Sequence, residues 1–174
     1  FLTKPIQQSR LIDELVKIFG APELGKKVAN LPATQVSLRG LRVLLAEDNA
    51  VNQQIAVELL TSVGATVDVA NHGAEVLEKM ADHGGTAYDV VLMDLQMPGM
   101  DGLEATRRLR AEPRFGTIPI IAMTAHAMTE VRDQCLEAGM NDHVVKPIRP
   151  EVLFQTLAQW CASALERAVE TEPE

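Results

Sequence analysis

The stretch VVLMDLQMPGMDG, at residues 90–102, determines the class of fold that the chain can adopt. Four apolar residues lead directly into Asp94, and a Pro-Gly loop separates this aspartate from a helical pattern. An unbroken apolar run bounded by turn residues is typical of a strand buried on both faces, as in a parallel sheet. Asp94 would then lie at the carboxyl end of the strand, where open α/β sheets bind their ligands. The stretch by itself is also compatible with Asp94 as a helix N-cap.

Strand and helix patterns alternate along the chain on both sides of this stretch. Apolar runs predict strands at 41–46, 66–70, 88–93, 118–123 and 142–145. Apolar residues at helical spacing predict helices at about 51–64, 74–84, 103–112, 128–139 and 150–168. Such alternation predicts an α/β fold with a five-stranded parallel sheet, doubly wound with helices on both faces. Right-handed crossovers leave few topologies for it.

The first 40 residues differ in composition from the rest. They carry six Lys/Arg and three Asp/Glu, a net charge of +3, whereas residues 41–174 carry ten and twenty-one, a net charge of -11. Apolar residues at helical spacing predict an extra helix at 6–19, ended by Gly20. Residues 21–39 contain two prolines and no sustained period, which predicts a linker. A domain boundary is therefore expected near residue 40.

Overall composition excludes some functions and leaves one redox expectation. The total charge of -8 argues against a nucleic-acid-binding surface. The sequence contains no run approaching 18 apolar residues, so no membrane span is expected. Cys135 and Cys161 lack metal-ligand spacing and are expected to be free thiols in a reducing, cytoplasmic environment.

Polar residues collect where the predicted strands end. Glu47 and Asp48 follow the first strand, Asp94 ends the third, and Thr124 and Lys146 end the fourth and fifth. A parallel sheet brings all these ends to one edge. Three acids there favour a hard cation such as Mg²⁺. The added lysine and hydroxyl argue against a merely solvated acidic edge and favour phosphoryl transfer, with an aspartyl phosphate as intermediate.

Residues 41 to about 162 resemble the receiver domain of two-component response regulators. The resemblance rests on LLAEDN at 44–49, VVLMDLQMPGMDG at 90–102, PIIAMTA at 119–125 and VVKP at 144–147. It implies the flavodoxin-like (βα)5 receiver fold, and a cis peptide bond between Lys146 and Pro147.

The resemblance also implies roles for individual residues. Asp94 corresponds to the phosphoacceptor, and Thr124 and Lys146 to the pair that senses the phosphoryl group. Glu47, Asp48, Asp94 and the backbone carbonyl of Gln96 correspond to the Mg²⁺ ligands. His143 stands where the family has its switch aromatic, which is more often Tyr or Phe.

Three shorter motifs narrow the resemblance to receivers fused to hybrid sensor histidine kinases. These are AEDNAVN at 46–52, TAH at 124–126 and GMNDH at 139–143. The expected function is therefore to accept a phosphoryl group from phosphohistidine on a histidine kinase domain and to relay it to a histidine phosphotransfer domain. A regulatory module whose phosphorylation gates the attached kinase stays open as the alternative. No kinase catalytic domain is expected in this chain, and the parent protein is expected in the cytoplasm or anchored in the inner membrane.

Two other classes of protein fit the sequence less well. Phosphatases with an aspartate nucleophile need a second aspartate two residues later, where Gln96 stands. Flavodoxins need a phosphate loop rich in Ser, Thr and Gly after the first strand, where AEDNAVN stands.

Two further expectations concern surfaces. LTKPI at 2–6 can be aligned with VVKPI at 144–148, which suggests that residues 1–20 are the end of a preceding receiver. Its helix at 6–19 would then expose an apolar face and could pair two copies of the chain. The expected domains are the remnant 1–20, the linker 21–39, the receiver 40–165 and an acidic tail 166–174.

An apolar patch for a partner's four-helix bundle is expected at Val51, Ile55, Pro147 and Ile148.

Overall fold

The computed structural model describes residues 37–170, apart from residues 83–86 and 127. The chain divides into two compact units, Phe1–Gln35 and Val36–Glu174. The expected helix at 6–19 and the expected receiver remnant at 1–20 lie outside the described residues. The second unit is described below.

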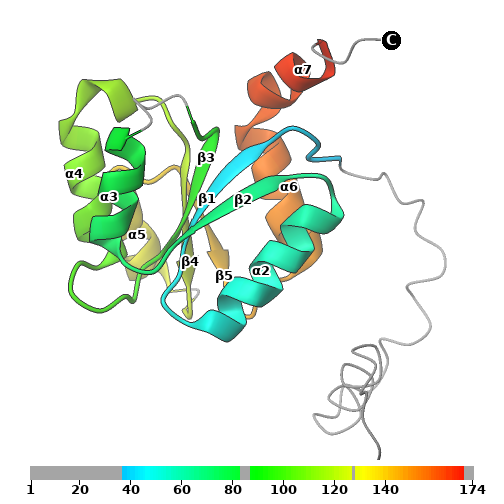
Figure 1. Cartoon of the computed structure of the whole chain (residues 1–174). Coiled ribbons are helices and arrows are strands. Elements are labelled where there is room, and N and C mark those ends of the chain that lie inside the picture. Colours follow the sequence, from blue (N-terminus) through cyan, green and yellow to red (C-terminus); the bar gives the residue numbers. More distant parts are fainter. Residues whose placement is uncertain (1–36, 83–86, 127, 171–174) are drawn as a thin grey trace, which may run out of the picture. The chain divides into compact units, whose positions relative to one another are not determined.

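A five-stranded sheet in the order β2-β1-β3-β4-β5 forms the centre of this unit (Figure 1). Every neighbouring pair is parallel. This order is that of the doubly wound flavodoxin-like fold, so the predicted fold class is confirmed. The strands are β1 (Arg42–Ala46), β2 (Thr66–Ala70), β3 (Val90–Asp94), β4 (Ile120–Thr124) and β5 (Asp142–Val145).

Helices cover both faces of the sheet. In Figure 1, α2 and α6 lie on one face and α3, α4 and α5 on the other. The helices are α2 (Ala50–Ser62), α3 (Gly73–Asp82), α4 (Gly102–Ala111), α5 (Thr129–Ala138), α6 (Pro150–Trp160) and α7 (Ala162–Glu170), with a 3-10 turn at Pro113–Phe115. Among the described helices, none combines the length and the apolar character needed to cross a bilayer.

The central strand β3 explains why the sheet needs both helical layers. All five of its residues are buried. Val91 and Met93 belong to the core under α3, α4 and α5, whereas Val90 and Leu92 belong to the core under α2 and α6. Each large apolar side chain removed from water contributes about 1.5–3 kcal/mol. A strand with apolar residues on both faces is therefore stable only between two layers of helices.

The structure corrects the predicted course of the last helix. Instead of one helix from 150 to about 168, α6 ends at Trp160 and α7 begins at Ala162. Cys161, between them, has φ -111° and ψ 17° and is buried in the core under α2 and α6. Ala164 and Leu165 of α7 pack against the same core. The break lets both helices follow that core.

The domain boundaries also differ from the expected ones. Leu38, expected in the linker, is fully buried, and its N–H donates to the carbonyl of Val63 at 2.9 Å. The folded unit therefore begins before residue 40. At the other end, residues 166–170 of the expected tail are part of α7. The two cysteines are buried free thiols, as expected, and burial raises the pKa of both.

Candidate active site

Three acids meet at the carboxyl ends of β1 and β3. Glu47 and Asp48 follow β1 directly, and Asp94 is the last residue of β3. The register pairs Ala46 with Met93, so both strands end at the same level. Each acid offers an oxygen within 4.8 Å of the others, which makes the group a candidate metal site. Glu47 and Asp94 are 1% and 5% exposed, whereas Asp48 is open to solvent.

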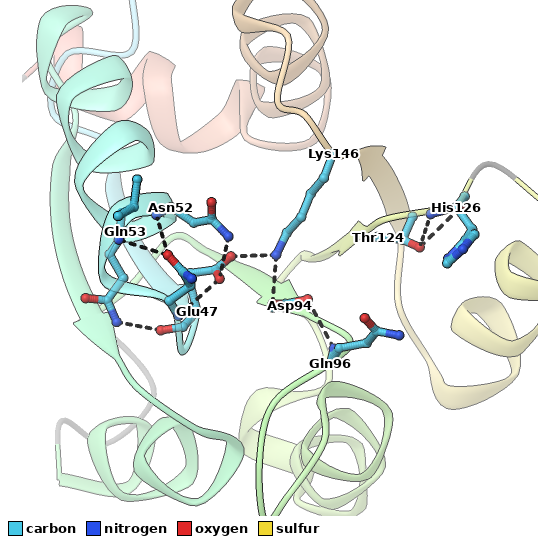
Figure 2. Close-up of polar contacts among 10 residues, drawn as sticks. Glu47, Asn52, Gln53, Asp94, Gln96, Thr124, His126 and Lys146 are labelled. Atoms are coloured by element: carbon cyan, nitrogen blue, oxygen red, sulfur yellow. Dashed lines mark hydrogen bonds and ion pairs between the residues drawn. The ribbon is translucent and has the colours of Figure 1, made fainter.

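Lys146 connects two of these acids from the end of β5. Its Nζ donates to Glu47 Oε2 at 2.6 Å and to Asp94 Oδ2 at 2.7 Å (Figure 2). Burial lowers the pKa of Lys146, but hydrogen bonds with Asp94 and Glu47 outweigh it and raise that pKa overall. The lysine therefore stays charged. The Lys146-Pro147 peptide bond is cis, as the resemblance implied.

The carboxylate of Asp94 lies in a place that disfavours its charge. Burial raises its pKa, and the hydrogen bonds from Lys146 and from the N–H of Gln96 only partly offset this. The Gln96 N–H donates to Asp94 Oδ1 at 3.1 Å. Both carboxylate oxygens of Asp94 thus have a donor. Asp94 is not a helix N-cap, because Asp101 caps α4 instead, accepting from the N–H of Glu104 at 2.8 Å.

Glu47 is held by side chains that sequence reasoning did not single out for a role. Its Oε1 accepts from Asn52 Nδ2 at 3.0 Å and from the N–H of Asn49 at 3.3 Å. Gln53 Nε2 donates to the Glu47 backbone carbonyl at 2.6 Å. Asn52 and Gln53 lie in the first turn of α2, which Asn49 caps through the N–H groups of residues 51 and 52. The sequence offers one indication of this contact: the two amides follow Glu47 by five and six residues, at the start of the predicted helix.

Thr124 lies at the same edge, but its hydroxyl contacts another group. Its Oγ1 accepts from the His126 N–H at 3.1 Å and lies 3.2 Å from the His126 carbonyl. Figure 2 shows this side chain directed toward His126, apart from the Lys146–Asp94 contact. The structure therefore brings Glu47, Asp48, Asp94 and Lys146 together and leaves Thr124 beside them without a bond to Asp94.

The remaining predicted residues lie around the site. His143, on β5, is half-buried, with Nδ1 at 3.7 Å from Asp142 Oδ1. Val51 and Ile55 of α2 are 66% and 49% exposed. Pro147 is exposed and Ile148 is half-buried against the core under α2 and α6.

The fold and the site together define an α/β protein with a buried aspartate, flanked by acids and a lysine, at the carboxyl edge of its sheet. The model of the response regulator receiver domain matches residues 43–158, and the chain belongs to this family.

Curated relatives of the chain are much longer sensor kinases. It is 42% identical over 120 residues to hybrid signal transduction histidine kinase I of Dictyostelium discoideum, a match covering 67% of this chain and 7% of that protein. It is 39% identical over 133 residues to the sensor protein GacS of Pseudomonas syringae pv. syringae, covering 75% and 14%. The chain thus spans a small part of the length of these relatives.

One similar solved structure contains a metal. This is the receiver domain of the sensor histidine kinase PA1611 from Pseudomonas aeruginosa PAO1, with a magnesium ion coordinated in its active-site cleft. The TM-score is 0.63 at 38% identity, covering 71% of this chain and 98% of that one. A putative response regulator from Chloroflexus aurantiacus is similar at TM-score 0.67 and 27% identity, covering 71% and 99%.

Proposed function

We propose that Asp94 accepts a phosphoryl group from a phosphohistidine of a histidine kinase domain and passes it to a histidine phosphotransfer domain. The observation that carries this proposal is the Lys146 ammonium, which lies within 2.7 Å of both the buried Asp94 and the buried Glu47. A nucleophilic carboxylate beside a fixed cation is suited to attack on phosphorus, because the cation offsets charge on the transferred group.

In the proposed reaction, a carboxylate oxygen of Asp94 forms a bond to phosphorus while the phosphorus–nitrogen bond of the donor breaks. The electron pair of that bond stays on the ring nitrogen of the donor histidine. Lys146 faces the phosphoryl oxygens, and the N–H of Gln96 holds the carboxylate in place. Thr124 donates its hydroxyl to the phosphoryl group after turning from His126, and His143 follows this change as the switch residue.

The acidic cluster fits Mg²⁺ as the cofactor of this reaction. Its donors are carboxylate oxygens, which are the ligands that this hard cation prefers, and they lie close enough to share one ion. Glu47, Asp48, Asp94 and the backbone carbonyl of Gln96 would hold the ion. When bound, it would offset the negative charge that these acids and the phosphoryl group bring together.

The relay to a phosphotransfer partner is supported by the surface beside the site. Val51 and Ile55 are large apolar side chains exposed on α2, and α2 begins next to the acids. With Pro147 and Ile148 they form the patch on which we propose that the partner's four-helix bundle docks. The resemblance to the receivers of hybrid histidine kinases supports the proposal that the chain is part of such a kinase. The alternative, phosphorylation that gates the attached kinase, would need no transfer through this patch.

Labelling by a small phosphodonor tests the acceptor. Acetyl phosphate with Mg²⁺ should modify the chain, and Asp94→Asn should abolish the modification because an amide is not a nucleophile here. Asp48→Ala should nearly abolish it by removing a metal ligand. Modification that persists in Asp94→Asn would exclude Asp94 as the acceptor.

Transfer to a cognate phosphotransfer domain separates the relay from the gating function. Val51→Asp should slow this transfer at least tenfold while labelling by acetyl phosphate stays unchanged. Leu136→Asp, which alters a side chain 49% exposed on α5, serves as the matched control. Unchanged transfer in Val51→Asp would show that the patch is not the docking site. If the unsubstituted chain transfers no phosphoryl group to the phosphotransfer domain, the gating function is favoured.

A further inference from the structure

The carboxylate of Glu47 depends on α2 for its orientation. It is buried, with Oε2 bound to Lys146 at 2.6 Å and Oε1 bound to Asn52 Nδ2 at 3.0 Å. The N–H of Asn49 makes a longer contact with Oε1, at 3.3 Å. Asn52 therefore provides the shorter of the two contacts on one oxygen of an acid that lies within the metal cluster.

Lys146 cannot fix this carboxylate by itself. Its ammonium also binds Asp94 Oδ2 at 2.7 Å, so it is shared between two acids. If Glu47 turned about its side-chain torsions, either Lys146 would leave Asp94 or Glu47 would lose its cation. A buried carboxylate without donors is costly, and hydrogen bonds to charged groups are among the stronger ones. The amide of Asn52 makes the observed orientation the favoured one.

The position of Asn52 is fixed independently of its contact with Glu47. The next residue, Gln53, donates to the Glu47 carbonyl at 2.6 Å and to Asn71 Oδ1 at 3.0 Å. Asn49 caps the helix by accepting from the backbone N–H of Asn52 at 3.2 Å. The first turn of α2 is therefore attached to the end of β1, and the Asn52 amide is held in reach of the acid (Figure 2).

We infer that Asn52 is a positioning residue that orients the Glu47 carboxylate for a divalent cation at the acidic cluster. This inference rests on the proposed function, because it assigns Mg²⁺ to that cluster. Partners that orient metal-binding side chains commonly affect metal affinity about 10–100-fold when they are removed. Replacing Asn52 is therefore expected to weaken Mg²⁺ binding more than it slows phosphorylation of Asp94 at saturating Mg²⁺.

Calorimetric titration with MgCl₂, without a phosphodonor, tests the inference directly. Asn52→Ala and the bulkier Asn52→Leu should each raise the dissociation constant for Mg²⁺ about tenfold. Gln54→Ala is the matched control, since Gln54 is an exposed amide on the same helix whose Nε2 donates to Glu58 Oε1 at 2.9 Å, and Glu58 is not part of the acidic cluster. Its affinity should stay within about twofold of the parent's, because it does not reach the acids. Urea unfolding of each variant measures whether the fold is retained.

A double-mutant cycle separates orientation from a general loss of structure. In a Glu47→Gln background, Asn52→Ala should change the dissociation constant less than twofold, because the charged group that it positions is gone. An unchanged affinity in Asn52→Ala would overturn the inference, as would an equal loss in the Glu47→Gln background. Absence of Mg²⁺ binding by the parent chain would overturn it as well.

Labelling by acetyl phosphate distinguishes failure of this inference from failure of the proposed function. At saturating Mg²⁺, Asn52→Ala should be labelled within about threefold of the parent rate, and at low Mg²⁺ about tenfold more slowly. A rate reduced equally at every Mg²⁺ concentration would overturn the inference while leaving Asp94 as the acceptor. A parent chain that binds Mg²⁺ but is not labelled would instead contradict the proposed function.

Discussion

Asp94 and Lys146 have opposite relations to their surroundings. Burial raises the pKa of Asp94 and so disfavours its carboxylate, whereas contacts with Asp94 and Glu47 raise the pKa of Lys146 and so favour its ammonium. Two buried acids share one lysine, which leaves the group with excess negative charge. A cation that joins them would relieve this excess. The buried carboxylate of Asp94 thus lies where a ligand that carries positive charge would be favoured.

The raised pKa of Asp94 leads to a prediction about the stability of the fold. A raised pKa means that the folded state binds this proton more tightly than the unfolded state. Ionising Asp94 therefore lowers the free energy of unfolding, and this loss develops as pH rises from the ordinary carboxyl range through the folded-state pKa. Asp94→Asn, measured without Mg²⁺, should therefore raise the free energy of unfolding at pH 7, because the amide carries no charge to desolvate. Lys146 keeps Glu47 as its partner in the variant.

Urea unfolding at several pH values checks this prediction. The gain should shrink as pH falls, since below the ordinary range the carboxyl is protonated in both states. Asp133→Asn removes an exposed carboxylate from α5 and provides the baseline. A gain that does not depend on pH, or a loss at pH 7, would contradict the electrostatic explanation.

At the scale of residues, the sequence predicted which polar groups lie together at the sheet edge better than it predicted their contacts. Placing Glu47, Asp94 and Lys146 at one edge required only strand ends and parallel pairing, which apolar runs indicate. The direction of the Thr124 hydroxyl depends on the loop to His126, and the reach of Asn52 depends on how α2 leaves β1. These contacts arise from tertiary packing, so residue spacing alone could not predict them.

At the scale of elements, α4 begins in contact with the strand that carries Asp94. Gly102, its first residue, donates its N–H to the Leu95 carbonyl at 3.3 Å. A Cβ at this position would overlap the backbone carbonyl of Asp94 and approach Met93 Cγ to 2.9 Å. Only glycine therefore lets the helix start this close to the end of β3.

Gly102→Ala should accordingly disturb both stability and labelling. Overpacking at a tight site costs about 1–3 kcal/mol. Displacement of the Asp94 backbone should also slow labelling by acetyl phosphate at least about tenfold, because the reaction depends on alignment of the nucleophile. Gly116→Ala is the comparison, since its φ of -60° suits alanine and a Cβ there would lie 3.3 Å from the Pro113 carbonyl oxygen, a contact that a shift of a few tenths of an ångström relieves. Equal, small effects in both variants would show that α4 can shift without moving Asp94.

Arg110 joins the end of α4 to the elements that follow it. Its guanidinium donates to the carbonyls of Gly139, Phe115 and Ile118 at 2.7–2.9 Å and to Asn141 Oδ1 at 2.9 Å. Gly139 has φ 97°, and a Cβ there would lie 2.8 Å from Arg110 Cγ, so the arginine stem occupies the space that glycine leaves. Burial lowers the pKa of Arg110.

Arg110→Lys should lower the free energy of unfolding by about 2–4 kcal/mol. A single ammonium cannot serve four acceptors arranged for a guanidinium, and each partly buried acceptor left without a donor costs about 1–3 kcal/mol. Arg108→Lys, on the same helix, alters an exposed pair with Glu104 and should cost less than about 0.5 kcal/mol. Urea unfolding compares them, and a loss no greater than that of Arg108→Lys would contradict the anchoring role.

The predicted elements agree with the observed ones where apolar periodicity changes from strand to helix. All five strands overlap their predicted ranges. The break at Cys161 was missed because Leu157, Cys161, Ala164 and Leu165 keep the apolar spacing of a continuous helix. Apolar periodicity indicates which face of a helix is buried. Because α6 and α7 both bury their apolar faces in the same core, the periodicity does not indicate where the helix axis changes direction.

At the scale of the whole molecule, the unit Val36–Glu174 should fold without the residues before it. Within the part of the chain that the structure describes, this unit contains two cores, one on each face of its sheet. The apolar face expected for the helix at 6–19 then remains a candidate for pairing two copies of the chain. The full chain should form dimers and the chain starting at residue 37 should be monomeric, as measured by light scattering. If the particles in both samples contain the same number of chains, this mode of pairing is excluded.

A second shortened chain tests where the folded unit begins. Leu38 is fully buried, and its carbonyl accepts from the N–H of Leu41 at 3.0 Å. A chain starting at residue 37 keeps these contacts and should match the full chain in free energy of unfolding within about 0.5 kcal/mol. A chain starting at residue 40 loses Leu38 and should be about 2–4 kcal/mol less stable, because a buried leucine and its cavity are involved. Acetyl phosphate labelling of Asp94 should survive in both, since Leu38 lies before β1 and the site follows it. Equal stability of the two shortened chains would show that Leu38 does not contribute to the folded unit and belongs to the linker.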